Sequence, residues 1–231
     1  MLSKEVLELS KQHSVIRDIF EFGMQRAREV GAENVFDFSI GNPSVPAPKE
    51  VDETARRLLD ELDPVDVHGY TSNAGILEVR EAIANSLNRR FHTNYTAANI
   101  FMTIGAAAAL GICFKSLVDG PDDEVITFAP YFPEYQVYAE GAGCKLIVIP
   151  ADTSSFQINF EELEKTISKN TKAVLINSPN NPSGVVYSEE TIKKLAALLE
   201  KKQKEYGHSI YIITDEPYRE IVYDGFEVPY V

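Results

Sequence analysis

The feature of this sequence that most restricts its fold is the alternation of short apolar runs with helical stretches after Asp123. The apolar runs predict four strands, at residues 124–128, 145–149, 172–176 and 209–213. Runs such as Val174-Leu175-Ile176 contain no polar residue, and such strands are usually covered on both faces. Strands that alternate with helices favour parallel pairing. We therefore predict an α/β fold with three layers, in which a mostly parallel sheet lies between two layers of helices.

Two of the helices between these strands have clear start and stop signals. One begins at Ser188, has two glutamates in its first turn, and ends at Gly207 after a lysine-rich last turn. That distribution of charge favours the helix dipole, and glycine commonly ends helices. A second helix is predicted to begin after Asn159, because an asparagine followed three residues later by Glu162 is typical of a capping pair.

The first half of the chain is predicted to be mainly helical, with one interruption. Residues 3–30 form a charged helical arm, whereas the three prolines between residues 43 and 48 exclude a helix there. Helical periodicity returns beyond Gly75, where four apolar residues recur at intervals of four: Val79, Ile83, Leu87 and Phe91. We expect an N-terminal arm and crossing segment at residues 1–47, and a larger domain at residues 48–231 that is incomplete at its C-terminus.

The composition excludes several classes of partner. The chain has 22 basic and 35 acidic side chains, a net charge of −13, which opposes binding to nucleic acids and to anionic membranes. The longest apolar stretch, residues 106–114, is too short to span a bilayer. Cys113 and Cys144 lie in apolar surroundings far apart in the sequence, so we expect reduced core thiols in a cytoplasmic protein. The four histidines are scattered and predict no metal site.

Unusual residues follow three of the four predicted strands, at the edge where parallel sheets bind ligands. Phe132 comes after the first strand, Asn181 after the third, and Asp215 with Tyr218 after the fourth. A fourth element is the run of small residues at 103–110, where a helix starts and its N-terminus favours phosphate. Together these elements provide an aromatic face, an amide, a phenol, a carboxylate and a phosphate-binding turn. That set matches pyridoxal phosphate.

In order and spacing, these motifs resemble the class I and II aminotransferases of the fold type I superfamily. The resemblance runs from residue 38 to residue 218 and rests on the following motifs: Ser39-Ile40-Gly41-Asn42-Pro43, Gly69-Tyr70, Gly105-Ala106-Ala107, Pro130-Tyr131-Phe132-Pro133, Asn181-Pro182-Ser183-Gly184 and Asp215-Glu216-Pro217-Tyr218. It implies the large domain of that fold, with pyridoxal phosphate as the cofactor. It also implies the transfer of an amino group between an amino acid and a 2-oxo acid, within amino acid metabolism.

By this resemblance, Asp215 is the carboxylate that faces the pyridine nitrogen and keeps the ring protonated. Asn181 and Tyr218 hydrogen-bond the phenolate oxygen of the cofactor, and Phe132 stacks on its ring. Each residue also has a purely structural interpretation. An Asp after a strand can cap a turn, Asn-Pro-Ser-Gly is a typical turn sequence, and single aromatic residues are commonly part of a core.

The same resemblance assigns the phosphate group to the amides of Gly105, Ala106 and Ala107, although this turn lacks the hydroxyl side chain that many relatives have there. Gly41 would let the backbone approach the substrate carboxylate. Tyr70 would reach the phosphate of a neighbouring subunit's cofactor, which implies a homodimer with shared sites. The small residues at 105–107 are equally typical of a packed helix. Gly41 and Tyr70 are equally typical of a loop.

The lysine that forms a Schiff base in this family has no counterpart in the chain. The last lysine is Lys204, so we expect the catalytic lysine beyond Val231 and expect this chain alone to be inactive. Lys115 falls within a predicted helix, and Lys145 and Lys172 lie at the starting ends of strands, away from the site. The chain thus resembles the N-terminal portion of the family.

Two other interpretations stay open. A pyridoxal-phosphate-dependent lyase that catalyses β-elimination needs the same contacts to the ring and phosphate. A non-catalytic folded fragment agrees with the missing lysine. A dinucleotide-binding domain is not favoured, because Gly141-Ala142-Gly143 follows a predicted helix and precedes a strand, which is the wrong context for a dinucleotide loop.

Overall fold

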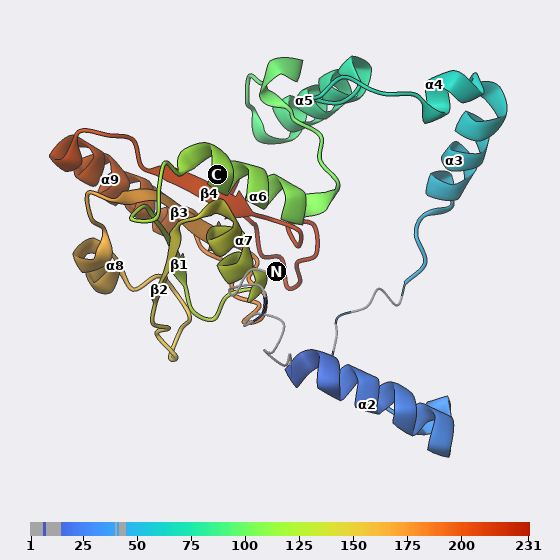
Figure 1. The fold of residues 1–231 in the computed structure, drawn as a ribbon, viewed down its shortest axis with the longest axis horizontal. Coiled ribbons are helices and arrows are strands. Elements are labelled where there is room, and N and C mark those ends of the chain that lie inside the picture. Colours follow the sequence, from blue (N-terminus) through green and yellow to red (C-terminus); the bar gives the residue numbers. More distant parts are fainter. Residues whose placement is uncertain (1–6, 8–14, 40, 42–44) are drawn as a thin grey trace. The chain divides into compact units, whose positions relative to one another are not determined.

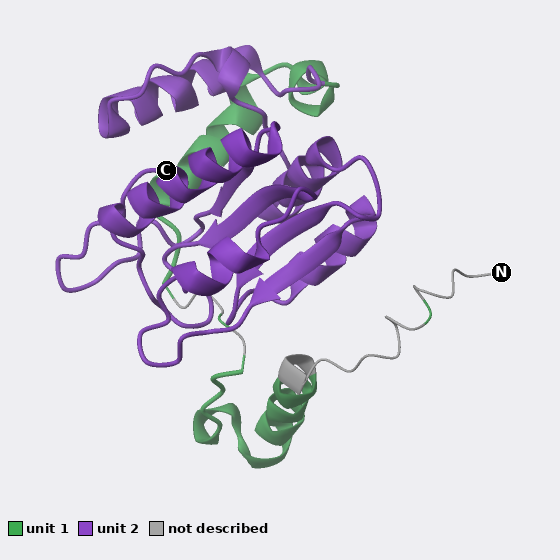
Figure 2. Cartoon of the chain, turned by 90° about the vertical axis from the view of Figure 1, so that its left-hand side faces the viewer, with its two compact units in different colours: residues 1–70 green, residues 71–231 purple. Residues whose placement is uncertain are grey.

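The computed structural model describes residues 7, 15–39, 41 and 45–231, which form two compact units (Figure 2). The first unit is Met1–Tyr70 and the second is Thr71–Val231. The division between the units lies after Tyr70, whereas the sequence suggested a domain boundary after residue 47. The helices that follow those prolines, α3 (Lys49–Glu61) and α4 (Pro64–His68), contact each other within the first unit.

The first unit also contains the helix α2 (Val15–Val30) and the short 3-10 helix η1 (Ala32–Asn34). Helix α2 covers the second half of the arm predicted at residues 3–30, whereas residues 1–6 and 8–14 lie outside the described residues. The same holds for residues 40 and 42–44 of the proline-rich segment. Gly31 ends α2 with φ of +92°, a conformation that glycine adopts without strain.

The second unit contains the sheet and the helices that flank it. Its elements in chain order are α5 (Leu77–Phe91), η2 (Ala97–Asn99), α6 (Gly105–Leu117), β1 (Glu124–Phe128), α7 (Glu134–Ala142), β2 (Lys145–Ile149), α8 (Phe160–Thr166), β3 (Thr171–Asn177), α9 (Glu189–Tyr206) and β4 (Tyr211–Asp215). The predicted bounds of β1 and β2 are confirmed. Strand β4 begins at Tyr211 rather than Ser209 and continues to Asp215.

All four strands are parallel and are arranged in the order β2-β1-β3-β4 (Figure 1). The chain leaves β1 toward β2 through α7, and it leaves β3 toward β4 through α9. Because these two connections run in opposite directions, the carboxyl ends of β1 and β3 form a topological switch point. Ligands of open parallel sheets bind at such points.

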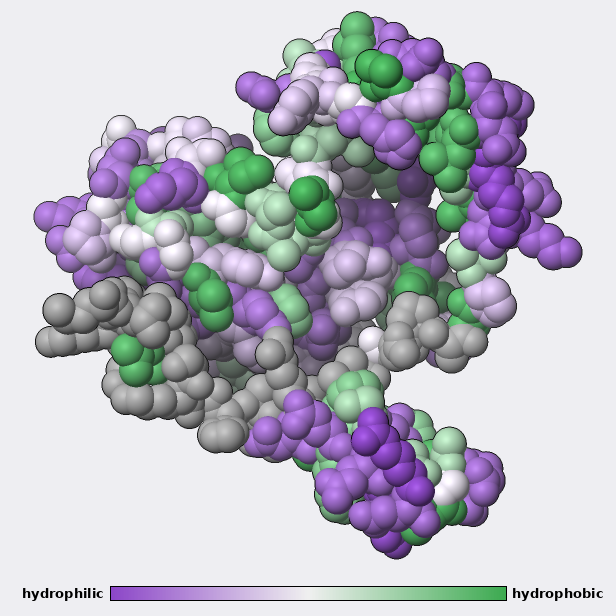
Figure 3. Space-filling view, turned by 45° about the vertical axis from the view of Figure 1, so that its right-hand side comes forward, coloured by the Kyte–Doolittle hydropathy of each residue, from purple (hydrophilic) through white to green (hydrophobic). Residues whose placement is uncertain are grey.

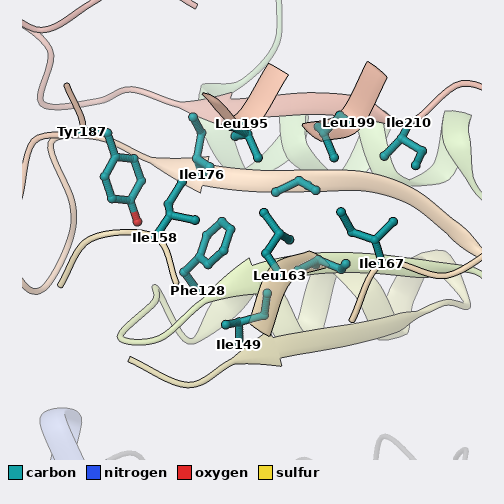
Figure 4. Packing of buried hydrophobic residues seen from close by; sticks show 12 residues of the cluster. Phe128, Ile149, Ile158, Leu163, Ile167, Ile176, Tyr187, Leu195, Leu199 and Ile210 are labelled. Carbon is teal, nitrogen blue, oxygen red and sulfur yellow. The ribbon is translucent and has the colours of Figure 1, made fainter. Parts of the chain in front are cut away.

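Apolar side chains cover both faces of the sheet, which confirms the predicted three-layer α/β architecture. On one face, side chains of α8 and α9 pack against β1 and β3 (Figure 4); the central residues are Leu163, Leu195, Leu199, Ile126 and Ile176. On the other face, α6 and α7 supply a second cluster that includes Leu110, Phe114, Tyr135 and Ala139. This second cluster also includes Val125 of β1, Ala173 and Leu175 of β3, and Ile213 of β4.

One expectation about the core is wrong. Cys113 is exposed, because α6 directs Leu110 and Phe114 toward the sheet and Cys113 lies on a different side of the helix. Cys144 is buried, and both thiols are free.

The apolar stripe of α5 is only partly covered. Val79 is 41% exposed, whereas Ile83, Leu87 and Phe91 are half-buried. Figure 3 shows other exposed hydrophobic side chains scattered among hydrophilic ones over the surface. None of the described helices is long and apolar enough to cross a membrane.

The predicted helix ends are confirmed. The side chain of Ser188 accepts a hydrogen bond from the backbone of Thr191 at 3.1 Å and caps α9, which ends at Gly207 in the left-handed conformation. Asn159 Oδ1 accepts from the Glu162 amide at 3.1 Å and caps α8. These caps satisfy amides that have no partner inside a helix.

Candidate functional site

A cavity of about 240 Å³ lies at the carboxyl ends of the strands. The predicted cofactor residues in its wall are Ala106, Ala107, Phe132, Asn181, Asp215 and Tyr218. The wall is completed by Leu110, Tyr138, Asn177 and Pro217. Elements that are distant in the sequence therefore converge here, as expected for the carboxyl edge of a parallel sheet.

Asp215 is the last residue of β4, and its carboxylate has a defined orientation. Tyr135 Oη donates a hydrogen bond to Asp215 Oδ2 at 2.7 Å. Asn177 Nδ2 donates to the main-chain oxygen of Asp215 at 2.7 Å. Burial raises the pKa of the Asp215 carboxyl above its usual value, and the charge of Glu216 acts in the same direction, whereas the hydrogen bond from Tyr135 lowers it. A cation brought to this carboxylate would be strongly attracted, because water screens the pair poorly.

Asn181 and Tyr218 lie next to each other in the loops after β3 and β4. The Asn181 Nδ2 to Tyr218 Oη distance is 3.3 Å. The main-chain amide of Asn181 donates to Asn177 Oδ1 at 2.7 Å, so the loop is attached to the end of β3. An amide and a phenol this close can both donate to a single oxygen atom of a ligand.

Phe132 contributes an aromatic face to the cavity. Its ring packs edge-on against Tyr135, with the ring centres 5.7 Å apart and an angle of 78° between the planes. Tyr135 also stacks with Tyr131, with the ring centres 6.3 Å apart and an angle of 17° between the planes. These contacts hold the Phe132 ring in place beside the carboxylate of Asp215.

Helix α6 begins at Gly105, directly beside the cavity. Gly105 has φ of +80°, a conformation that disfavours other residues. Ala106 and Ala107 line the cavity, whereas Gly105 does not. The first amides of a helix have no intrahelical acceptor and favour anions. The nearby hydroxyl of Thr103 donates to the Gly105 carbonyl at 2.9 Å, so it is already engaged.

The remaining predicted residues, Gly41 and Tyr70, belong to the first unit. Both are exposed, and Tyr70 has a fully accessible side chain. The residues on both sides of Gly41 lie outside the described residues. The roles inferred for these two residues stay predictions.

Sequence reasoning assigned no role to Tyr135, Asn177 and Tyr138, although all three belong to the site. Asn177 could have been found from its position, because it is the register partner of Asp215 at the ends of β3 and β4. Burial raises the pKa of Tyr138, and the charges of Glu134 and Asp215 add to this effect. No pattern in the sequence distinguishes Tyr135 from its aromatic neighbours.

A second cavity, of about 370 Å³, contains none of the predicted site residues. Its wall is formed mainly by apolar residues from two segments, 184–186 and 221–226. Although this cavity is larger, it lacks the converging carboxylate, amide and phenol of the smaller one. Within the described ranges, no group of three histidines, cysteines or carboxylates could hold a metal ion. The smaller cavity is therefore the candidate site.

Comparison with known proteins identifies the family of this chain. The family model "Aminotransferase class I and II" matches residues 33–230. A probable N-acetyl-LL-diaminopimelate aminotransferase of Bacillus subtilis is 34% identical over 193 residues, which are 83% of this chain and 46% of that protein. A probable aspartate aminotransferase of Methanocaldococcus jannaschii is 36% identical over 211 residues, which are 91% of this chain and 51% of that protein. The chain thus spans about half the length of the curated relatives it matches.

Solved structures show the same fold. An amino transferase from Eubacterium rectale matches 100% of this chain with a TM-score of 0.96 and 56% identity, and the match covers 58% of that chain. The aspartate aminotransferase of Thermus thermophilus with maleate matches 99% of this chain with a TM-score of 0.82 and 29% identity, and the match covers 56% of that chain. The resemblance predicted from the motifs is confirmed, and this chain belongs to the class I and II aminotransferases, a family that depends on pyridoxal phosphate.

Proposed function

We propose that this chain provides the cofactor-binding part of an aminotransferase that moves an amino group between an amino acid and a 2-oxo acid. The convergence of Asp215, Asn181, Tyr218 and Phe132 on one cavity supports this proposal. Pyridoxal phosphate has a pyridine nitrogen, a phenolate oxygen, an aromatic ring and a phosphate. The cavity offers a chemical partner for each of them, so its residues fit the cofactor.

Asp215 would face the pyridine nitrogen. When bound, pyridoxal phosphate supplies an electron sink for the charge that develops at the substrate α-carbon. The contribution of Asp215 is to hold a proton at the ring nitrogen, because a carboxylate there favours the protonated form. Tyr135 and Asn177 already hold this residue at both its side chain and its main chain.

Asn181 and Tyr218 would bind the phenolate oxygen, and Phe132 would lie against the ring. The 3.3 Å distance between Asn181 Nδ2 and Tyr218 Oη suits two donors to one oxygen. The amides at Gly105, Ala106 and Ala107 would bind the phosphate, because the start of a helix favours negative charge.

The proposal extends to the first unit and to the assembled protein. Gly41 would lie near the substrate carboxylate, and Tyr70 would contribute to the phosphate site of a second subunit in a homodimer. A protein of this family with two free thiols suits the reducing cytoplasm and a place in the biosynthesis of amino acids.

Equilibrium dialysis of the purified chain against pyridoxal phosphate tests the proposal without requiring a covalent bond. We expect the unaltered chain to bind the cofactor and the Asp215→Asn variant to bind it about tenfold or more weakly. This ratio is the usual effect of losing a hydrogen bond to a charged group. The matched control is Asp123→Asn, because Asp123 Oδ2 also accepts a short hydrogen bond, from the Asp119 amide at 2.6 Å, at the opposite edge of the sheet.

Equal affinities of the two variants for the cofactor would contradict the assignment of Asp215. No lysine is among the residues that line the described cavity. Borohydride reduction of the mixture should therefore leave the protein mass unchanged. A stable phosphopyridoxyl group on one lysine, together with measurable amino transfer, would show that a different residue performs the chemistry.

A further inference from the structure

A short polar contact at the cavity joins Tyr135 and Asp215. The hydroxyl of Tyr135 donates to Asp215 Oδ2 at 2.7 Å, although the two residues are 80 positions apart in the sequence. Among the described residues, Asp215 Oδ1 has no such hydrogen bond. The two carboxylate oxygens therefore differ, because one is bound to the protein and the other is available to a ligand in the cavity.

The position of the Tyr135 hydroxyl is itself well determined. The side chain is 1% exposed and belongs to the apolar cluster between α6, α7 and the sheet. Its ring contacts the rings of both Tyr131 and Phe132. A ring packed on several sides has few alternative rotamers, so its hydroxyl can fix the rotation of the carboxylate about its Cβ–Cγ bond.

We propose that Tyr135 is a positioning residue, which holds Asp215 with Oδ1 directed to the ligand. The inference rests on the proposed function for the identity of the ligand, but the coupling between the two side chains can be measured without it. Tyr135 also packs against Phe132, so the same side chain would hold both the carboxylate and the aromatic face of the cavity.

The effect on ionisation follows from opposing influences on Asp215. Burial favours the neutral acid, whereas the hydroxyl of Tyr135 donates to the charged form and favours it. Other titratable groups near the carboxylate come from α6, α7 and the segment after β4: Cys113, Tyr138, Glu216 and Tyr218. Glu216 is paired with Arg219 at 2.6 Å. Tyr135 is the group that donates directly to the Asp215 side chain.

The test is the Tyr135→Phe variant, which removes the hydroxyl and keeps the ring. The matched control is Tyr206→Phe, because Tyr206 Oη also donates one hydrogen bond, to the Ile167 carbonyl at 3.1 Å, at the other edge of the sheet. The ionisation of Asp215 is followed by ¹³C NMR of carboxyl-labelled aspartate without cofactor, and its signal is identified by its loss in Asp215→Asn. Cofactor affinity is then measured by dialysis at several pH values.

We expect the Asp215 carboxyl to titrate at higher pH in Tyr135→Phe than in the unaltered chain, and to be unchanged in Tyr206→Phe. Affinity for pyridoxal phosphate at neutral pH should fall in Tyr135→Phe only, because the carboxylate of Asp215 is then less well oriented and less fully ionised. An unchanged Asp215 titration in Tyr135→Phe would overturn the inference and leave the proposed function standing. If the unaltered chain binds no cofactor, the proposed function fails, and the NMR titration still decides the role of Tyr135.

Discussion

Asn177 connects two parts of the candidate site, and its replacement by alanine gives a sharp test of how that site is held together. The side chain donates to the Asp215 carbonyl at 2.7 Å and accepts from the Asn181 amide at 2.7 Å. It is 5% exposed, so water has little access to these bonds. Asn177→Ala removes both of them without moving the strand, because β3 remains paired with β1 and β4.

The expected loss of stability can be estimated from these two bonds. A hydrogen bond contributes about 1 kcal/mol net, and a buried group left without a partner costs about 1–3 kcal/mol. Both main-chain partners are only partly buried, which favours the lower end of that range. We expect the free energy of unfolding to fall by roughly 2 kcal/mol, or about 1 M in the urea midpoint for a typical slope of ~2 kcal/mol/M.

The assay combines urea unfolding with cofactor dialysis, and Asn88→Ala is the matched control. Asn88 makes similar bonds in α5, where Nδ2 donates to the Tyr95 carbonyl at 2.8 Å and Oδ1 accepts from the Tyr95 amide at 2.7 Å. Both variants should lose stability, but only Asn177→Ala should weaken cofactor binding. The reasoning fails if Asn177→Ala is as stable as the unaltered chain, or if the two variants bind pyridoxal phosphate equally well.

Two further predictions concern the same cavity. Gly105→Ala should destabilise the fold by about 1–2 kcal/mol, because alanine is strained at φ of +80°, and should weaken cofactor binding. By contrast, Gly111→Ala lies in the middle of α6, where an added Cβ meets no atom within 4 Å, so it should stabilise the fold by up to about 1 kcal/mol. A lower melting temperature for Gly111→Ala than for Gly105→Ala would contradict this prediction. Burial raises the folded pKa of Asp215, so its contribution to stability is largest at acidic pH and is lost as the pH rises through that pKa. The free energy of unfolding of Asp215→Asn, compared with that of the unaltered chain, should therefore increase from acidic to neutral pH in urea titrations. A decrease of this difference over the same range would refute the sign.

Several elements were predictable because their signals are local. The apolar runs at residues 124–128 and 145–149 form β1 and β2 with those bounds. The ends of α9 are set by Ser188 and Gly207, whose effects act within one helical turn. Strand β4 was predicted two residues too early because the apolar run ends at Ile213, whereas pairing with β3 extends the strand to Asp215.

Cys113 shows a different limit of local reasoning. It lies in the most apolar stretch of the sequence, yet it is exposed, because the packing of α6 on the sheet selects Leu110 and Phe114. Composition indicates that a helix is apolar, but only its partner determines which side is buried.

The sequence by itself determined the parallel α/β fold and the residues that gather at the carboxyl edge of its sheet. Strand-and-helix periodicity and short motifs such as Asp215-Glu216-Pro217-Tyr218 carry this information. The tertiary structure alone decided which side chains hold the site, namely that Tyr135 donates to Asp215 and that Asn177 joins Asp215 to Asn181. The physical reason is that a hydrogen bond between residues 80 positions apart depends on strand register and on the packing of α7, neither of which leaves a local pattern in the chain.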